Sequence, residues 1–526
     1  MMFQLVLVLA ALAALFYYFA IKPLSYWKER GIKQTKPVWL LGDSWGTFLK
    51  MHSLVDFVQN VYDQVPGVRY FGLYEMVTPT LAIRDPDLIK QIAVKDFEHF
   101  TDHRIMFPKN SDPLMGKNLF ALKGQVWRDT RPILSPTFTS SKMRAMFVLM
   151  SECGENFIKY FLDNDKDTIE TEMKDTFRRF TNDVIATTAF GVKTDSLKHR
   201  DNDFFVMGMK AVDFGFWKSL KFFGYILMPK VLGFFKVTIF GKELNEFFMD
   251  LINKTVRIRE EKGIVRPDMI HLLMEARKGI QQKEEKVIDT GFAVVEEADL
   301  GYGKGAKEIT NEDIAAHALI FFFAGFDGVS SLMCFTIYEL AVNPDIQNRL
   351  REEVEETFRE CNGKITYEGL LKMKYLDMVV SETLRKWPIA VMADRLCTRP
   401  YTIPPATPDE KPLYIEKNTV ILFPIWPIHR DPAFYENPDR FDPERFNDEN
   451  KSKINPYTYL PFGIGPRNCI GSRFALLETK VVLFYLLVNF IIEPSAKLNV
   501  PLKISKKQFN VTAEGGFWFN LKKIKK

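Results

Sequence analysis

A single cysteine in a stiff loop that leads into a helix is the feature that most constrains this chain. Residues 461–473 read PFGIGPRNCIGSR, in which Gly463 and Gly465 permit backbone conformations closed to other residues and the prolines restrict the turn. Residues 474–487, FALLETKVVLFYLL, carry apolar residues at helical spacing. We therefore expect Cys469 at or just before a helix N-terminus, where free backbone N–H groups and the helix dipole stabilise a thiolate.

A thiolate held in this way acts either as a nucleophile or as a metal ligand. A cysteine nucleophile needs a base, and none of the seven histidines lies near Cys469 in the sequence. One soft anionic ligand suits the iron of a haem, because the macrocycle supplies four nitrogens and needs one axial ligand. Scattered cysteines without CxxC spacing argue against a disulfide framework and a zinc site; they are Cys153, Cys334, Cys361, Cys397 and Cys469.

The cysteine loop resembles the haem-binding loop of the cytochrome P450 family, F-x-x-G-x-R-x-C-x-G. The matching residues are Phe462, Gly465, Arg467, Cys469 and Gly471. The resemblance implies a bound haem b with the Cys469 thiolate as the axial ligand of its iron. It also implies that family's fold, which is mainly α (α+β): a helical domain with small β-sheets around a buried haem, plus an N-terminal transmembrane helix.

Two further motifs follow in the order that the family has them. ETLRKWP contains Glu382 and Arg385, which match the family's E-x-x-R, and FDPERF supplies Arg445. The resemblance implies that these three residues form a buried network, and buried charges must be fully paired to be tolerated. We therefore expect a structural role for them.

Three arginines and a tryptophan resemble the family's partners for the two haem propionates. Trp127 and Arg131 in WRDTR match its W-x-x-x-R, and Arg395 and Arg467 look like further propionate partners. Arginine suits this role because its planar fork pairs with a carboxylate through two hydrogen bonds.

Residues 309–343, ITNEDIAAHALIFFFAGFDGVSSLMCFTIYELAVN, predict one long helix with Thr310 or Asn311 as its N-cap. Within it, AGFD resembles the family's A-G-x-D/E, which implies that Ala324 and Asp327 are catalytic residues, placed where dioxygen binds and protons are delivered. Helical spacing predicts that the face over the cofactor carries Ile320, Ala324, Asp327 or Gly328, and Ser331.

The next residue departs from the family pattern, which has a threonine where this chain has Gly328. Glycine carries no hydroxyl donor, so we expect a water between Asp327 and Ser331 to relay protons, which makes Ser331 a candidate catalytic residue. The departure leaves alternatives open. One is a monooxygenase with proton delivery by water or substrate, another is a haem-thiolate isomerase or dehydratase, and a third is a haem sensor without turnover.

Residues 204–240 are rich in aromatic residues and lysines. They predict two helices packed on the core, or alternatively a pair whose outer face enters a membrane and roofs a substrate cavity. Phe323, Phe326 and Ala390 are candidates for the wall of that cavity. Residues 275–310 are predicted to form a surface loop, because they mix charges with several glycines.

The first 21 residues contain no charged side chain and are long enough to cross a bilayer as a helix. We expect a transmembrane signal anchor at 1–21, a looser linker at 22–45 and the catalytic domain at 46–526. A cleaved signal peptide is the alternative, with ALA at 11–13 as its site, but no basic segment precedes the apolar stretch. Because basic residues follow it, the positive-inside rule predicts a single-pass protein with a cytosolic catalytic domain, and the resemblance implies the endoplasmic reticulum as its membrane.

Taken together, the resemblance is strongest to the microsomal type and its insect detoxification family 9 branch, on LSPTFTSSKM (134–143), RPDMIHLLMEA (266–276) and IHRDPAFYENPDRFDPERF (428–446). It implies insertion of one oxygen atom from O2 into apolar small molecules such as xenobiotics, plant toxins, insecticides or lipophilic endogenous compounds. Electrons would come from NADPH through NADPH-cytochrome P450 reductase, with cytochrome b5 as a second candidate donor. A net charge of +5 and the lack of an RNA-binding signature argue against nucleic acid. Basic residues that could meet the reductase are Arg128, Arg467, Arg473 and Lys480.

Overall fold

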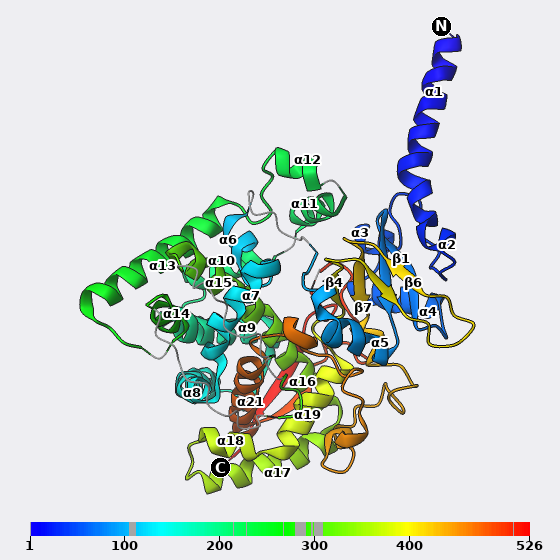
Figure 1. The fold of residues 1–526 in the computed structure, drawn as a ribbon. Helices are drawn as coiled ribbons and strands as arrows, with labels where there is room; N and C mark the ends of the chain where they lie inside the picture. Colours follow the sequence, from blue (N-terminus) through cyan, green and yellow to red (C-terminus); the bar gives the residue numbers. More distant parts are fainter. Residues whose placement is uncertain are drawn as a thin grey trace.

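The computed structural model describes residues 2–104, 112–213, 215–227, 229–266, 268–278, 291–295, 298, 309–508 and 510–525. Helices dominate this part of the chain, and its named strands form a four-stranded, a three-stranded and a two-stranded sheet (Figure 1). The expectation of a mainly helical domain with small sheets is confirmed.

The N-terminal helix α1 (Met2–Phe16) stands out from the rest of the molecule (Figure 1). It continues through short helical turns into α2 (Tyr26–Glu29), and the whole segment from Met2 to Glu29 is long and apolar enough to cross a membrane. A second helix of that kind, Asn311–Val342, is mostly buried inside the domain. Only the first therefore exposes an apolar surface along its length.

The segment that follows α1 is packed onto the domain and differs from the expected loose linker. Trp27 is fully buried, and its indole lies so close to Gly72 that a Cβ there would come within 2.2 Å of it. Thr35 N donates to Gly72 O at 3.0 Å, and Arg30 pairs with Glu416 at 2.8 Å. The base of α1 is therefore fixed by packing, a backbone hydrogen bond and an ion pair.

Two strands early in the chain form an antiparallel pair, β1 (Tyr70–Glu75) and β2 (Thr78–Ile83). This pair continues into β7 (Val420–Phe423), which is parallel to β2, and then into β4 (Ala393–Leu396), which carries Arg395. The other strands are β3 (Thr168–Glu172), β8 (Phe490–Pro494) and β9 (Trp518–Lys523) in one sheet, and β5 (Tyr401–Ile403) and β6 (Leu413–Ile415) in another.

A long helical rod runs through the domain and begins where the sequence predicts. Thr310 is the N-cap, because its Oγ1 accepts from the N–H of Asp313 at 3.1 Å while the Asp313 carboxylate accepts from the Thr310 N–H. The rod consists of α15 (Asn311–Ala324), a π-helical turn η7 (Gly325–Val329) and α16 (Ser330–Val342). The π turn, which adds a residue to the helix, was not predicted.

Two hydrophobic clusters contact this rod, one including α16, α19 and α21 and the other including α10, α13 and α15. In chain order the helices of four or more residues that carry α labels are α3 (Trp45–Phe48), α4 (Leu54–Gln64), α5 (Pro86–Lys90), α6 (Pro113–Lys117), α7 (Gly124–Leu134), α8 (Ser140–Leu162), α9 (Met173–Ile185), α10 (Asp203–Val212), α11 (Phe216–Leu227), α12 (Pro229–Phe234), α13 (Lys242–Lys262), α14 (Met269–Arg277), α17 (Pro344–Glu360), α18 (Tyr367–Lys372), α19 (Lys374–Lys386), α20 (Ile425–Ile428) and α21 (Ser472–Asn489).

The aromatic-rich stretch forms three helices, α10, α11 and α12, where two were expected. Phe222 and Tyr225 are buried, whereas Trp217 and Phe234 are 72% and 81% exposed. Figure 1 shows α11 and α12 at the end of the domain from which α1 projects. Most of the predicted surface loop at 275–310 lies outside the described residues.

Candidate active site

A cavity of about 550 Å³ lies between the loop that carries Cys469 and the long helical rod. Apolar side chains form most of its wall, among them Ile320, Val329 and Ile389. The predicted site residues that line this cavity are Trp127, Arg131, Ala324, Arg395, Phe462, Arg467, Cys469 and Gly471.

The cysteine loop has the stiff geometry that its glycines predict. Gly463 and Gly465 have φ of 74° and 72°, and a short 3₁₀ turn, η10 (Gly465–Arg467), follows. A Cβ on Gly465 would come within 2.0 Å of the carbonyl oxygen of Ala93, so no other residue fits there. The N–H of Cys469 donates to Phe462 O at 2.8 Å. Cys469 is thus held on the cavity wall, three residues before α21.

Arg131 reaches from α7 to the residue next to the cysteine. Its guanidinium donates to the backbone oxygen of Asn468 at 2.9 Å and to the Asn468 side-chain oxygen at 2.8 Å. Arg467 donates to Thr101 O at 2.7 Å and to Leu122 O at 2.8 Å, and it lies over the ring of Trp127 at 4.0 Å. These two arginines therefore fix the loop to the segment around α7.

Buried positive charge gathers on this wall. Arg395 is 1% exposed and donates to Ile464 O at 2.7 Å, while its Nε is buried without a hydrogen-bond partner in the described part of the chain. Burial lowers the pKa of Arg395 to about 10 and that of Arg467 to about 9, because water no longer solvates their charge. Anionic groups in the cavity would compensate them, and the carboxylates of a haem fit this donor set.

His103 and Asp394 also belong to this wall, and the sequence analysis missed both. Nδ1 of His103 lies 3.1 Å from Oδ1 of Asp394, and both residues line the cavity. The pair joins a segment before α6 to β4, so no local spacing in the sequence indicates it. The only signal is that Asp394 directly precedes the predicted propionate partner Arg395.

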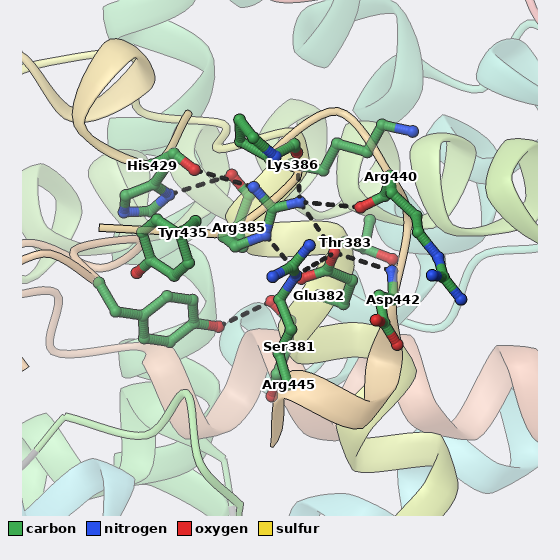
Figure 2. Close-up of polar contacts among 12 residues, drawn as sticks. Ser381, Glu382, Thr383, Arg385, Lys386, His429, Tyr435, Arg440, Asp442 and Arg445 are labelled. Carbon is green, nitrogen blue, oxygen red and sulfur yellow. Dashed lines mark hydrogen bonds and ion pairs between the residues drawn. The ribbon is translucent and has the colours of Figure 1, made fainter. Parts of the chain in front are cut away.

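The residues of the predicted charged network contact one another (Figure 2). Glu382 and Arg385 are fully buried on α19 and pair at 2.7 Å, and Arg445 Nε lies 3.5 Å from Glu382. Arg385 also donates to His429 O at 2.8 Å, and Nε2 of His429 accepts from the N–H of Leu460 at 2.8 Å. The network therefore leads directly to the start of the loop at Pro461.

The helical rod presents Ala324 and Gly328 to the cavity, with Ile320 on the same face. Beyond the π turn, Leu332 lines the cavity in the place predicted for Ser331. The extra residue of a π turn rotates the following side chains by roughly 100°, which moves Ser331 off this face. The prediction that Ser331 lines the cavity is therefore wrong.

Asp327 also points away from the cavity and is held by two cations. Arg178 Nη2 and Lys174 Nζ lie 2.6 and 3.1 Å from its Oδ1, and Asn510 donates to its Oδ2 at 2.6 Å. Burial opposes ionisation of Asp327, but Lys174 and Arg178 outweigh it and lower its pKa to about 2. Lys174 also donates to the hydroxyl of Ser331 at 2.5 Å, so the lysine stands where a relaying water was expected.

Two sets of predicted residues differ in the structure: the candidates for the cavity wall, and the basic residues expected to face a reductase. Ala390 lines the cavity, but Phe326 stacks on Phe322 in the core and Phe323 packs against Phe240. Phe321, two residues before Phe323, lines the cavity instead. Of the basic residues expected to face a reductase, Arg467, Arg473 and Lys480 are buried; Lys480 pairs with Asp377 at 2.7 Å, and Arg128 pairs with Glu98 at 2.7 Å.

The comparisons with known proteins agree with this geometry. A family model described as Cytochrome P450 matches residues 33–518. Cytochrome P450 9e2 of Blattella germanica is 44% identical over 513 residues, with 94% of this chain and 93% of that protein covered. Probable cytochrome P450 9f2 of Drosophila melanogaster is 42% identical over 531 residues, with 99% of each chain covered.

A more distant relative, Cytochrome P450 6k1 of Blattella germanica, is 35% identical over 514 residues, with 97% of this chain and 95% of that protein covered. Because relatives of family 9 match at up to 44% identity, the predicted resemblance to the insect family 9 branch is confirmed. The chain belongs to the cytochrome P450 family of haem monooxygenases, whose iron is bound by a cysteine thiolate.

Proposed function

We propose that this protein is a membrane-bound, NADPH-dependent monooxygenase that inserts one oxygen atom from O2 into apolar small molecules. The observation that carries the proposal is the pairing of Cys469 on one wall of an apolar cavity with the small residues Ala324 and Gly328 on the other. The small side chains at 324 and 328 keep bulk out of the cavity on the rod side, which suits a flat cofactor bound through the thiolate.

The residues of the cysteine wall have distinct roles in this proposal. Cys469 supplies the axial thiolate, and a haem so ligated provides oxygen activation. Arg131 and Arg467 hold the loop. Arg395, whose buried Nε has no hydrogen-bond partner among the described residues, is suited to pair with a haem carboxylate. Trp127 shields this polar region by stacking on Arg467.

In this proposal, protons are supplied from the face of the rod that lies opposite the cavity. Asp327 is ionised there and bonded to Arg178, whose side chain is 16% exposed. We infer that a proton can pass along the far side of the rod through Asp327 and Ser331, with Lys174 between the two side chains, although none of the three lines the cavity. Gly328 adds no hydroxyl of its own, so the last transfer uses water or the substrate.

The substrate class follows from the wall. Ile320, Val329 and Ile389 present apolar side chains that can select a substrate by its shape but not by hydrogen bonding. Such walls discriminate between similar molecules by only about 1–3 kcal/mol, so a broad range of lipophilic compounds fits, plant toxins and insecticides among them. The exposed aromatics of α11 and α12 would enter the same membrane as α1, the endoplasmic reticulum, from which lipophilic substrates partition.

The test is turnover of the full chain in phospholipid vesicles with NADPH-cytochrome P450 reductase and a lipophilic probe substrate. We expect NADPH consumption that requires the reductase, and product that carries one atom of isotopically labelled dioxygen. Omitting cytochrome b5 should slow turnover without abolishing it.

A second function, a haem-thiolate isomerase or dehydratase, is favoured by one observation, the glycine at position 328. Turnover of a lipid hydroperoxide without reductase, together with no label from dioxygen in any product, would establish that function and contradict the first.

A further inference from the structure

His103 lines the cavity beside the buried arginines, and the proposed function gives it no role. The residue is 7% exposed, and its ring stacks on Phe120 with the centroids 4.5 Å apart. Its Nδ1 lies 3.1 Å from Oδ1 of Asp394. The imidazole is therefore fixed at one face and at one edge, in a wall that also carries Asp394 and several arginines.

The partners of Asp394 determine which ring nitrogen is free to titrate. Asp394 accepts from the backbone N–H of Arg104 at 2.8 Å through its other oxygen. Burial opposes ionisation of this carboxyl, but His103 and Arg104 outweigh burial and hold its pKa below the usual range. A carboxylate only accepts, so Nδ1 of His103 carries a proton. Nε2 has no hydrogen-bond partner in the described part of the chain and is the atom that can gain or lose one.

The groups around the ring act in opposite directions, and their net effect is to lower the pKa of His103. Burial lowers the pKa of the His103 ring, whereas Asp394 raises that pKa. Arg395 and Arg467 lower it further. A negative charge added to the cavity would therefore shift the ring toward its protonated form. The charged groups that face it are Asp394 and Arg395 from β4, Arg467 from the cysteine loop, Asp102 and Arg104 from its own segment, and Lys123, which interacts with Asp102, Asp394 and Arg467.

We propose that Nε2 of His103 takes up a proton from solvent when the haem iron receives an electron. The proposal rests on the haem site described above. A one-electron donor is oxidised, the ferric iron becomes ferrous, and the proton forms the new Nε2–H bond. The added positive charge offsets the added electron, and the imidazolium gains a donor for a haem carboxylate. His103 is thus a positioning residue that couples reduction to protonation.

The test is the midpoint potential of the substrate-free full chain in lipid nanodiscs, measured spectroscopically at several pH values around 6.5, the ordinary pKa of histidine being about that value. We expect the potential to fall as pH rises, by up to about 59 mV per pH unit, the one-electron equivalent of a tenfold change in proton concentration. A potential that does not change with pH would overturn the proposal.

Variants assign the effect to one residue. His103→Arg keeps a cation but cannot titrate, so its potential should not depend on pH. His99→Gln is the matched control and should keep the slope, because the His99 ring contacts Pro400 O and lies outside the cavity. Asp394→Asn, which removes the carboxylate that favours protonation, should move the sloping region to lower pH. A slope that survives in His103→Arg contradicts the proposal.

The carbon monoxide spectrum of each sample separates this proposal from the haem site itself. A wild-type protein with the thiolate-type band and a flat potential refutes only the role of His103. A wild-type protein without that band refutes the haem site. If His103→Arg does not retain haem, the predicted shift of the slope in Asp394→Asn decides the matter.

Discussion

The loop that carries Cys469 and the rod that faces it are held in different ways. On the loop side, Arg131 donates a hydrogen bond to Asn468, and Arg385 donates to His429, which in turn accepts from Leu460. Buried charges therefore fix the backbone on both sides of the cysteine. On the rod side the cavity face consists of small and aliphatic residues at a π-helical turn. Asp327, the carboxylate within this turn, is held on the opposite face.

The difference separates two requirements of the site. The position of the thiolate depends on groups that are stable only when all are present, since an unpaired buried charge is costly. The rod places its polar chemistry away from the cavity, so residue 328 can vary with little effect on folding. We therefore expect changes on the loop side to act on stability and haem retention, and changes at residue 328 to act on coupling.

Glu382→Gln should have the largest effect on stability. It leaves Arg385 fully buried without its charge partner, and breaking such a pair typically costs about 3–5 kcal/mol. Thermal unfolding of the haem-loaded protein should begin at markedly lower temperature, with early loss of the thiolate-type band. The control is Glu243→Gln, which breaks an exposed pair with Lys210 and should cost about 0–1 kcal/mol. Equal effects of the two changes would contradict the claim that the buried pair matters more for stability than an exposed pair.

Asp327→Asn should have an intermediate effect. Burial opposes its ionisation, yet Lys174 and Arg178 lower its pKa to about 2, so ionised Asp327 stabilises the fold by about 2 kcal/mol. That contribution is complete above the ordinary pKa of aspartate, about 3.9, and is lost as pH falls through about 2. The stability difference between wild type and variant should therefore shrink below about pH 4. A difference that is constant with pH would show that the carboxylate is not charged in the fold.

The smallest effect on stability is expected for Gly328→Thr. A Cβ at this position meets only Cγ2 of Ile389, at 3.8 Å, so a side chain fits and stability should change by less than about 1 kcal/mol. The added hydroxyl should raise the product formed per NADPH consumed. Gly328→Ala is the matched control, because it fills the same space without a donor and should leave that ratio unchanged. An unchanged ratio in Gly328→Thr would mean that the missing hydroxyl has no consequence.

The sequence predicted the loop side well because its determinants are local. A glycine before the cysteine, the i,i+3 spacing of Glu382 and Arg385, and the helix after Cys469 are all visible in short segments, and the structure has each of them. The rod was predicted as a helix with the right N-cap, and Ile320, Ala324 and Gly328 line the cavity as predicted, but Ser331 does not. A single π-helical turn changes which side chains share a face, and spacing rules that assume 3.6 residues per turn miss it.

Contacts between distant segments were beyond the sequence. His103 meets Asp394 across 291 residues of chain, and Trp27 finds Gly72 only because the segment after α1 folds back on β1. Lys174 reaches Ser331 from α9 in the same way. None of these pairs has a local pattern, because each depends on how the elements pack.

The most direct test of the account is the carbon monoxide difference spectrum of the reduced full chain and of Cys469→Ala. Cys361→Ser, which changes a cysteine outside the cavity, serves as the control. We predict a thiolate-type band in the wild type and in Cys361→Ser, and its loss in Cys469→Ala. A wild-type protein without that band, or a Cys469→Ala protein that keeps it, would contradict the assignment of Cys469 as the iron ligand.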